Sequence, residues 1–295
     1  PLNPQRQPML VDAHVHLQPH GEQPRVDRER IQLYVETALA NGLDGVVFTE
    51  HLFRFHEAYD LLQGWWDAEA NAHLAKAAAA YWRDHVNLSL SNYVSLIEQA
   101  KSEGLPVFLG MEMDWIPGKA DVLRGILAPY AWDLVLGSVH WIGAFGFDEE
   151  ENLDEWDRRD VDTVFAEYGQ LIGELADSGL ADVLAHPDVP KIFGHKPTNF
   201  RPLHDEIVAA AVRGGCALEI NTNGLLKPVA ELYPSPALLR AANRAGIPVT
   251  LASDAHVPER LGQAFDLAVT AARDAGYTGY TRFQRRKRHF EAFRD

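Results

Sequence analysis

Seven short apolar runs recur along the chain, and amphipathic or alanine-rich stretches separate them. Each run has the length and residue types of a buried β-strand, and the runs cover 9–13, 45–49, 106–111, 134–138, 182–185, 217–220 and 248–252. The intervening stretches have a helical pattern over about 26–41, 65–101, 119–129, 158–178, 203–214, 234–245 and 258–275. Strands that alternate with helices are typical of parallel sheets joined by helical crossovers.

The alternation runs through the whole chain without a Pro- or Gly-rich linker. This pattern favours a single domain that spans residues 1–295. The expected fold is a distorted (β/α)7 TIM-like barrel of the α/β class, and a doubly wound open sheet is the structural alternative. The long connection over about 52–104 is either a lid over the active face or an extra pair of surface helices. A final hairpin is expected over about 280–293, around a basic turn that we expect to face solvent.

The composition narrows the classes of function. A formal net charge of −15 over 295 residues argues against a broad electrostatic contact with nucleic acid or an anionic membrane. It is compatible with a small anionic substrate, because bound metal ions can reverse the local field. The acidic stretch 148–160 is expected to be solvated.

The same composition bears on the compartment. The single cysteine excludes internal disulfides, which suits a reducing cytoplasm. The N-terminal residues lack a signal-peptide pattern, and no apolar run approaches the roughly 18 residues needed to span a membrane. We therefore expect a cytoplasmic protein, and the sequence does not predict its oligomeric state.

Polar residues follow every predicted strand. In chain order they are His14 and His16, Glu50 and His51, Glu112 and Asp114, His140, His186 and Asp188, Asn221, and Asp254 and His256. The carboxyl ends of the strands in a parallel barrel lie on one face, where such enzymes place their active sites. Buried imidazoles and carboxylates without partners would be costly, whereas metal coordination satisfies them.

The number of candidate ligands indicates more than one ion. Histidines two apart on an extended chain point to the same side, so His14 and His16 can share a metal. Six histidines and two or three carboxylates exceed the three protein ligands of a single catalytic zinc. We expect two or three divalent ions, Zn, Fe or Mn, with a carboxylate such as Glu112 bridging them.

The motifs "DAHVH", "TEH", "GMEMDW", "GSVHW", "AHPD", "EIN" and "SDAH", in this order, resemble the PHP (polymerase and histidinol phosphatase) family. The nearest branch is that of the stand-alone histidinol-phosphate phosphatases, and the resemblance covers about residues 10 to 265. It implies a distorted seven-stranded barrel with a trinuclear metal centre that hydrolyses phosphoesters. By matched motif position it implies as metal ligands His14, His16, His51, Glu112, His140, His186, Asp254 and His256. A further family ligand, usually histidine, falls on Glu22, whereas His20 is expected to lie in a loop.

The resemblance also bears on substrate binding. The segment "HPDVPKIFGHKP" resembles a basic, phosphate-facing loop, in which Lys191 is the first candidate and Lys196 the second; both can equally be ordinary surface lysines. In "EINTNGLLKP", Leu226 stands where the family has arginine, and Lys227 follows it. Lysine reproduces the bidentate phosphate contact of arginine poorly. Other small phosphates or nucleotides are therefore alternative substrates.

We expect the hydrolysis of a small phosphomonoester, foremost histidinol phosphate to histidinol and phosphate in histidine biosynthesis, by in-line attack of a metal-bridging hydroxide. Asp254 or His256 is expected to protonate the leaving group. Asn221 is expected near the substrate, and three aspartates are expected to orient ligands, namely Asp12, Asp114 and Asp188. A purely structural role at the end of the strand is the alternative for Asp12.

Three other classes of protein were weighed. Amidohydrolases also begin with His-x-His on a barrel strand, but "LVLGSVH" offers no bridging lysine on the middle strand. A nuclease role has no evident basic groove to support it. A catalytically silent protein that binds metal or a phosphorylated ligand is the non-enzyme alternative, and the intact ligand set argues against it.

Overall fold

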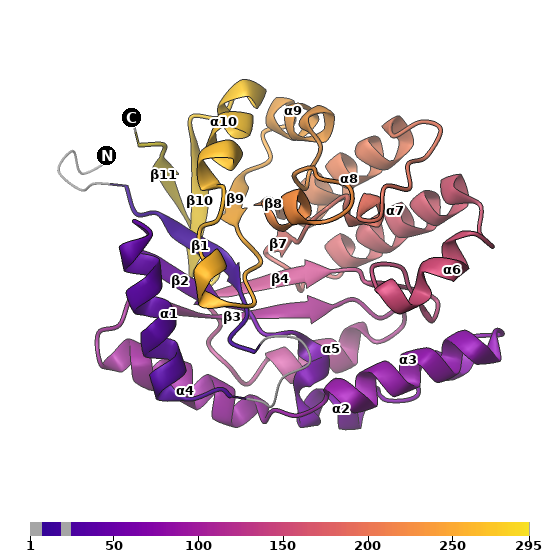
Figure 1. Cartoon of the computed structure of the whole chain (residues 1–295), viewed down its shortest axis with the longest axis horizontal. Helices are drawn as coiled ribbons and strands as arrows, with labels where there is room; N and C mark the ends of the chain where they lie inside the picture. The colour runs from indigo at the N-terminus through magenta and orange to yellow at the C-terminus, as the bar shows by residue number, and fades with distance from the viewer. Residues whose placement is uncertain (1–7, 19–24, 295) are drawn as a thin grey trace.

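The central sheet consists of seven parallel strands in a computed structural model that describes residues 8–18 and 25–294. The strand order is β1-β2-β3-β4-β7-β8-β9, and all seven predicted strands are present (Figure 1). Their bounds are β1 Val11–Val15, β2 Gly45–Phe48, β3 Val107–Asp114, β4 Leu134–Ser138, β7 Val183–Leu184, β8 Ala217–Asn221 and β9 Val249–Ala252. Glu22 and His20 lie outside the described residues, so the predicted ligand role of Glu22 stays a prediction.

The first and last strands of this sheet meet. Val15 forms a parallel bridge with Ala255, just beyond β9, and the His16 N–H donates to the Ala255 carbonyl at 2.8 Å. The sheet is therefore a nearly closed barrel, which confirms the predicted fold class and makes the open-sheet alternative wrong. The pairing of β1 with β2 shifts register between Asp12 and Val15, next to the predicted ligands. Such bulges re-aim side chains near active sites.

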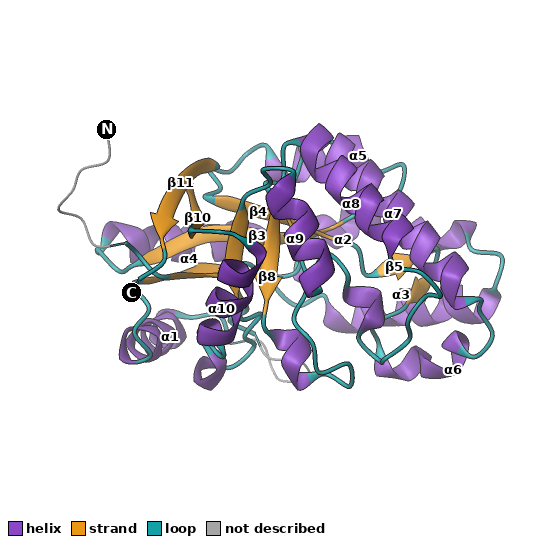
Figure 2. Cartoon of the chain, turned by 90° about the horizontal axis from the view of Figure 1, so that it is seen from above, coloured by secondary structure: helices purple, strands orange, loops and turns teal. Residues whose placement is uncertain are grey.

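Helices surround the barrel on its outside (Figure 2). They are α1 Arg28–Ala40, α2 His56–Leu62, α3 Ala72–His85, α4 Leu90–Ser102, α5 Ala120–Leu127, α6 Leu153–Trp156, α7 Val161–Asp177, α8 Arg201–Gly214, α9 Pro236–Arg244 and α10 Phe265–Ala275. Short 3-10 turns are η1 Leu52–Arg54, η2 Trp65–Ala68, η3 Glu150–Asn152, η4 Val189–Lys191, η5 Asn223–Leu226 and η6 Pro258–Arg260. Polar caps fix several helix starts, since Asp27, Ser89 and Asp160 each accept a first-turn N–H. No helix within residues 8–18 and 25–294 is long and apolar enough to cross a membrane.

The long connection 52–104 combines a normal crossover helix with extra structure. Helix α4 is the crossover, because its Tyr93 hydroxyl bonds the carbonyls of Phe48 on β2 and Gly110 on β3 at 2.7 and 3.0 Å. The remaining part, with α2 and α3, is held together by packed tryptophans. The ring centroid of Trp65 lies 5.4 Å from that of Trp141 and 5.8 Å from that of Trp82. Trp141 belongs to a short antiparallel pair that the sequence did not predict, β5 Trp141–Ile142 and β6 Phe145–Gly146.

The C-terminal strands β10 Gly279–Gln284 and β11 Lys287–Ala292 form an antiparallel hairpin that closes the end of the barrel where the strands begin (Figure 1). Phe283 joins an apolar cluster inside the barrel that also contains Val11, Val47, Phe108, Leu134, Leu136, Val183 and Ala217. The four residues of the basic turn, Arg285 to Arg288, are exposed as expected, and two of them also contact the barrel. The Arg285 N–H donates to Asp133 at 2.9 Å, and the Arg286 guanidinium pairs with Asp182 at 3.0 Å, because these aspartates precede β4 and β7 at the same end.

Candidate active site

Predicted ligands from different strand ends converge at the other end of the barrel. Three groups of side chains each bring their nitrogen or oxygen donors within 4.8 Å of one another. The first group is His16, His51 and His256, the second is His14, His16 and Asp254, and the third is His51, Glu112 and His140. The groups share members, so they form one continuous cluster. Parallel strands deliver these side chains to one face, as the sequence predicts.

Glu112, near the end of β3, lies at the centre of the cluster and is buried. Its Oε2 is 2.6 Å from His51 Nδ1 and 3.2 Å from His14 Nε2. Its Oε1 is 3.0 Å from His186 Nε2 and 3.4 Å from His140 Nε2. The two oxygens face different histidines, which is the arrangement expected of a carboxylate that bridges two ions.

Asp254 completes the side of the cluster that faces β1. Its Oδ1 lies 3.4 Å from His16 Nε2 and 3.6 Å from His14 Nε2, and the two Nε2 atoms are 3.0 Å apart. His256 Nδ1 is 3.8 Å from the same oxygen. Asp254 and His186 both have positive φ angles, of 54° and 27°. Such backbone conformations are uncommon for residues other than glycine, although Asp and His adopt them more readily than most, and they concentrate at functional sites.

The donor set fits divalent metal ions. His14 and His16 are fully buried, and their facing Nε2 atoms can share only one hydrogen bond between them. Glu112 Oε2 is buried, and imidazole nitrogens of His51, His14 and His16 lie 2.6 to 3.5 Å from it. A buried group of imidazole nitrogens and carboxylate oxygens with incomplete hydrogen bonding is what Zn, Fe or Mn coordination satisfies.

The carboxylates of the cluster are held in their charged form. Burial acts to raise the pKa of Glu112, but the nearby imidazoles of His51 and His14 oppose it and bring this pKa well below its usual range. Burial likewise acts to raise the pKa of Asp254, and His14 and His16 bring it well below its usual range. Both groups are therefore anionic acceptors, as a cation site requires.

Two other carboxylates fix the rings of the histidines. Asp114 Oδ1 lies 2.7 Å from His140 Nδ1, in the orienting position expected for it, and burial raises the pKa of Asp114. Glu219 on β8, which was not predicted, lies 2.8 Å from His14 Nδ1 and accepts the His186 backbone N–H at 2.7 Å. With Nδ1 engaged, each ring directs Nε2 into the cluster. The sequence "LEIN" could have predicted this role, because Glu219 lies two residues before Asn221 and therefore points to the same face of the strand.

Two of the predicted polar residues, Asp12 and Asn221, form hydrogen bonds within the protein that fix the positions of strand ends and of a carboxylate. Asp12 accepts from the Ser253 N–H at 3.0 Å and the Gly262 N–H at 2.9 Å, and burial raises its pKa to about 6. Asp12 contacts no proposed ligand side chain among the described residues. It connects the end of β9 to β1, which is the structural role given above as the alternative. The fully buried Asn221 donates to Asp254 Oδ2 at 3.3 Å, so it orients this carboxylate and does not face a substrate as expected.

The structure does not support the two lysines predicted to face phosphate. Lys191 is fully buried, and its ammonium lies 3.0 Å from Asp188 and 3.2 Å from Glu231. Lys196 pairs with the same glutamate at 2.6 Å. Asp188 holds Lys191 and the Ser235 N–H instead of orienting a ligand. Acidic side chains therefore neutralise both lysines. Lys191 is a buried ammonium, whereas Lys196 is an exposed surface lysine in an ion pair, as its alternative predicted.

A cavity of about 590 Å³ opens onto the cluster. The connection 52–104 forms one wall of it with Phe53, Tyr81 and His85, and Lys227 also lines it. The acidic residues 148–151 form another wall, so this part of the acidic stretch is not simply solvated as expected. Asp148 Oδ2 lies 3.9 Å from His140 Nε2, and burial, together with the Asp148 charge, raises the pKa of Glu149 to about 7. The cavity thus has aromatic and acidic walls beside the cluster.

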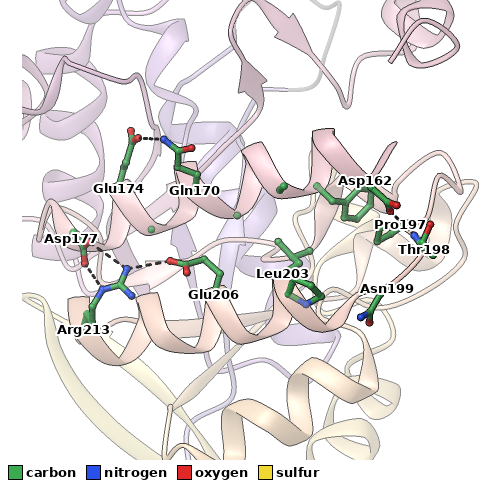
Figure 3. Close-up of a pocket in the computed structure, with 15 residues that line it drawn as sticks. Asp162, Gln170, Glu174, Asp177, Pro197, Thr198, Asn199, Leu203, Glu206 and Arg213 are labelled. Atoms are coloured by element: carbon green, nitrogen blue, oxygen red, sulfur yellow. Dashed lines mark hydrogen bonds and ion pairs between the residues drawn. The ribbon is translucent and has the colours of Figure 1, made fainter. Parts of the chain in front are cut away.

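A second hollow, of about 880 Å³, lies between α7 and α8 on the outside of the barrel (Figure 3). Its charged side chains pair with each other, since Arg213 contacts both Asp177 and Glu206 at 3.1 and 3.3 Å. None of the residues predicted for the site lines it. The chemistry is therefore concentrated at the carboxyl ends of the strands.

Comparisons with known proteins agree with the motifs. Residues 16–223 match the PHP domain, and residues 238–272 match the PHP-associated region. The chain is 38% identical, over 94% of its length and 98% of the relative, to a protein of Deinococcus radiodurans named probable histidinol-phosphatase. It is 26% identical to the histidinol-phosphatase of Bacillus subtilis, over 86% of this chain and 96% of that one.

Solved structures show the same fold. The histidinol phosphate phosphatase of Lactococcus lactis, solved with zinc, L-histidinol and phosphate, matches with a TM-score of 0.71 and 22% identity, over 95% of this chain and 98% of that one. A putative histidinol phosphatase of Listeria monocytogenes matches with a TM-score of 0.68 and 21% identity, over 87% of this chain and 99% of that one. At these identities the likeness concerns the fold.

Proposed function

The chain belongs to the PHP domain family, and we propose that it is a phosphoesterase that hydrolyses histidinol phosphate to histidinol and phosphate with the help of divalent metal ions. The observation that carries the proposal is Glu112, whose two oxygens face different histidines in one buried cluster. The substrate rests on similarity over 94% of the chain to a probable histidinol-phosphatase. A cytoplasmic location and a role in histidine biosynthesis belong to the same proposal.

Two or three divalent ions, Zn, Fe or Mn, are assigned to the cluster. The Oε2 atom of Glu112 faces His14, His16 and His51, and Asp254 and His256 lie next to His16. The Oε1 atom faces His140 and His186. When bound, the ions neutralise the charge of the phosphate and activate water for attack on phosphorus. The protein holds the ligand rings through Asp114 and Glu219, so that the donors are in place before substrate arrives.

The cavity walls suit the organic part of histidinol phosphate, which carries an imidazole ring and an amine. The aromatic side chains of Phe53 and Tyr81 offer a face to a flat ring, and the acidic residues 148–151 attract a cationic group. His256 borders the cavity next to the cluster and is the candidate for protonating the leaving oxygen. Asp254 was the other candidate, but His14 and His16 hold it in its charged form, so it lacks the proton that this role requires.

The test is a phosphate-release screen of the full chain supplied separately with Mn, Zn and Fe. The substrates are histidinol phosphate, sugar phosphates, nucleotides and phenyl phosphate, beside a panel of amides. The proposal expects the highest kcat/KM on histidinol phosphate and no amide hydrolysis. Preference for another phosphate would replace the substrate, and no release from any phosphoester at saturating metal would overturn the function.

A further inference from the structure

Two cationic side chains line the cavity, namely Lys227, the predicted substrate-binding lysine beside Leu226, and Arg260, for which the sequence predicts no role. Lys227 directly follows η5, and Arg260 is the last residue of η6. Resting on the proposed function, we propose that Arg260 and Lys227 together bind the phosphate group of the substrate. Arg260 thereby supplies the guanidinium that the sequence lacks at Leu226.

Both cations are free to take an anion. Neither Arg260 nor Lys227 forms a side-chain hydrogen bond or ion pair with any residue in 8–18 or 25–294, and they are the two Lys or Arg residues of the described cavity lining. The other basic candidates are already neutralised. Glu231 contacts both Lys191 and Lys196.

The elements that carry the two cations flank the same side of the metal-ligand cluster. In η5, Asn223 Nδ2 donates to Asp254 Oδ2 at 3.2 Å, which joins the segment of Lys227 to a proposed metal ligand. In η6, Arg260 comes four residues after His256, another proposed ligand that lines the cavity. Both cations therefore lie on segments next to proposed metal ligands and line the cavity that opens onto the cluster.

The remaining walls give the phosphate one favourable orientation. The acidic residues 148–151 line the cavity from the connection that follows β4, and they repel a phosphate dianion. Leu226 is 47% exposed and does not line the cavity, so its side chain leaves the phosphate position to Arg260 and Lys227. The phosphate then lies toward β8 and β9, and the cationic leaving group lies toward residues 148–151.

Arginine and lysine contribute differently to this pair. A guanidinium can give two parallel hydrogen bonds to phosphate oxygens, whereas an ammonium acts as a point charge. We therefore expect Arg260 to account for most of the phosphate affinity. Arg260→Lys restores the charge without the bidentate geometry and should fall between the wild type and Arg260→Gln.

The test uses the full chain loaded with metal and two readouts, the KM for histidinol phosphate and the inhibition constant of inorganic phosphate. Arg260→Gln should raise both by roughly 10-fold or more, the effect of losing a hydrogen bond to a charged group. Lys227→Gln should raise both by a smaller factor. Arg244→Gln, on the exposed surface of α9, is the matched control and should change neither.

Two checks separate this inference from the function on which it rests. Metal content and thermal unfolding of Arg260→Gln should equal those of the wild type, and a loss of metal would contradict phosphate recognition. An unchanged inhibition constant of phosphate in both Arg260→Gln and Lys227→Gln would overturn the inference. The proposed function would still stand in that case, provided that the wild type releases phosphate. If the wild type releases no phosphate, the function fails, and calorimetric binding of inorganic phosphate to the same variants still decides the role of the pair.

Discussion

The two ends of the barrel are built from the same strands and have opposite chemistry. Where the strands begin, the interior is apolar and includes Val11, Phe108 and Leu134, with Phe283 of the hairpin packed onto it. Where the strands end, the interior carries imidazoles and carboxylates around Glu112. Stability and reactivity are thus assigned to different ends, which is the usual division of a (β/α) barrel.

The buried carboxylates at the two ends are satisfied differently. At the first end, Asp133 accepts from the Leu109 N–H at 2.9 Å and pairs with Lys101 at 2.7 Å. At the second end, Glu112 Oε2 is surrounded by the imidazoles of His51, His14 and His16, at 2.6 to 3.5 Å. The first end is complete in itself, whereas the donors of the second end fit the divalent ions that we propose for it. The following substitutions test this difference, in order of decreasing expected effect.

Glu112→Gln should abolish turnover. The amide keeps the shape of the side chain but lacks the charge that can hold two ions together. We expect kcat to fall by roughly 10³-fold, the scale of losing a main electrostatic contribution to the transition state, with a loss of bound metal measured by elemental analysis. Glu36→Gln, on the exposed face of α1, is the control. Retained metal with near wild-type kcat would refute the bridging role.

Phe283→Ala should destabilise the protein without affecting the chemistry. Its ring is 3% exposed and fills the apolar end of the barrel, so truncation should lower the free energy of unfolding by about 3–5 kcal/mol. Phe290 on the partner strand is 55% exposed, and Phe290→Ala should have little effect. Urea denaturation measures both variants. Equal effects would show that the hairpin does not close this end.

Glu219→Gln should weaken metal binding without emptying the site. It removes the charge opposite His14 Nδ1 and preserves the shape of the side chain. Metal affinity should fall by about 10–100-fold, as measured by competition with a chelator. Asp114→Asn should act similarly through His140. Unchanged affinity in both variants would mean that these carboxylates do not set the orientation of the rings.

Arg286→Ala should have the smallest effect. The pair with Asp182 is partly exposed, since the arginine side chain is 36% exposed, so its loss should cost about 1 kcal/mol or less in the free energy of unfolding. The neighbouring exposed residue gives the control Lys287→Ala. The kcat should not change in either variant. A large loss of activity would mean that the two ends are coupled.

The sequence predicts those features that depend on local pattern. Apolar runs locate all seven barrel strands, and the polar residues after them include every ligand of the cluster within the described residues. The errors concern tertiary partners. The burial of Lys191 depends on Glu231, 40 residues away, and the place of Asp148 depends on an unpredicted β5–β6 pair. Glu219 was missed because a strand residue between apolar neighbours looks like an ordinary solvent-facing position until the barrel interior is known.

The central claim is that the cluster around Glu112 binds the ions that the hydrolysis of histidinol phosphate requires. The most direct measurement is phosphate release from histidinol phosphate by chelator-treated protein, titrated with Zn, Mn or Fe. Without metal we expect no release, and with added metal we expect activity to rise and to saturate at two to three ions per chain. Full release by the metal-free protein, or no release at saturating metal, would contradict it.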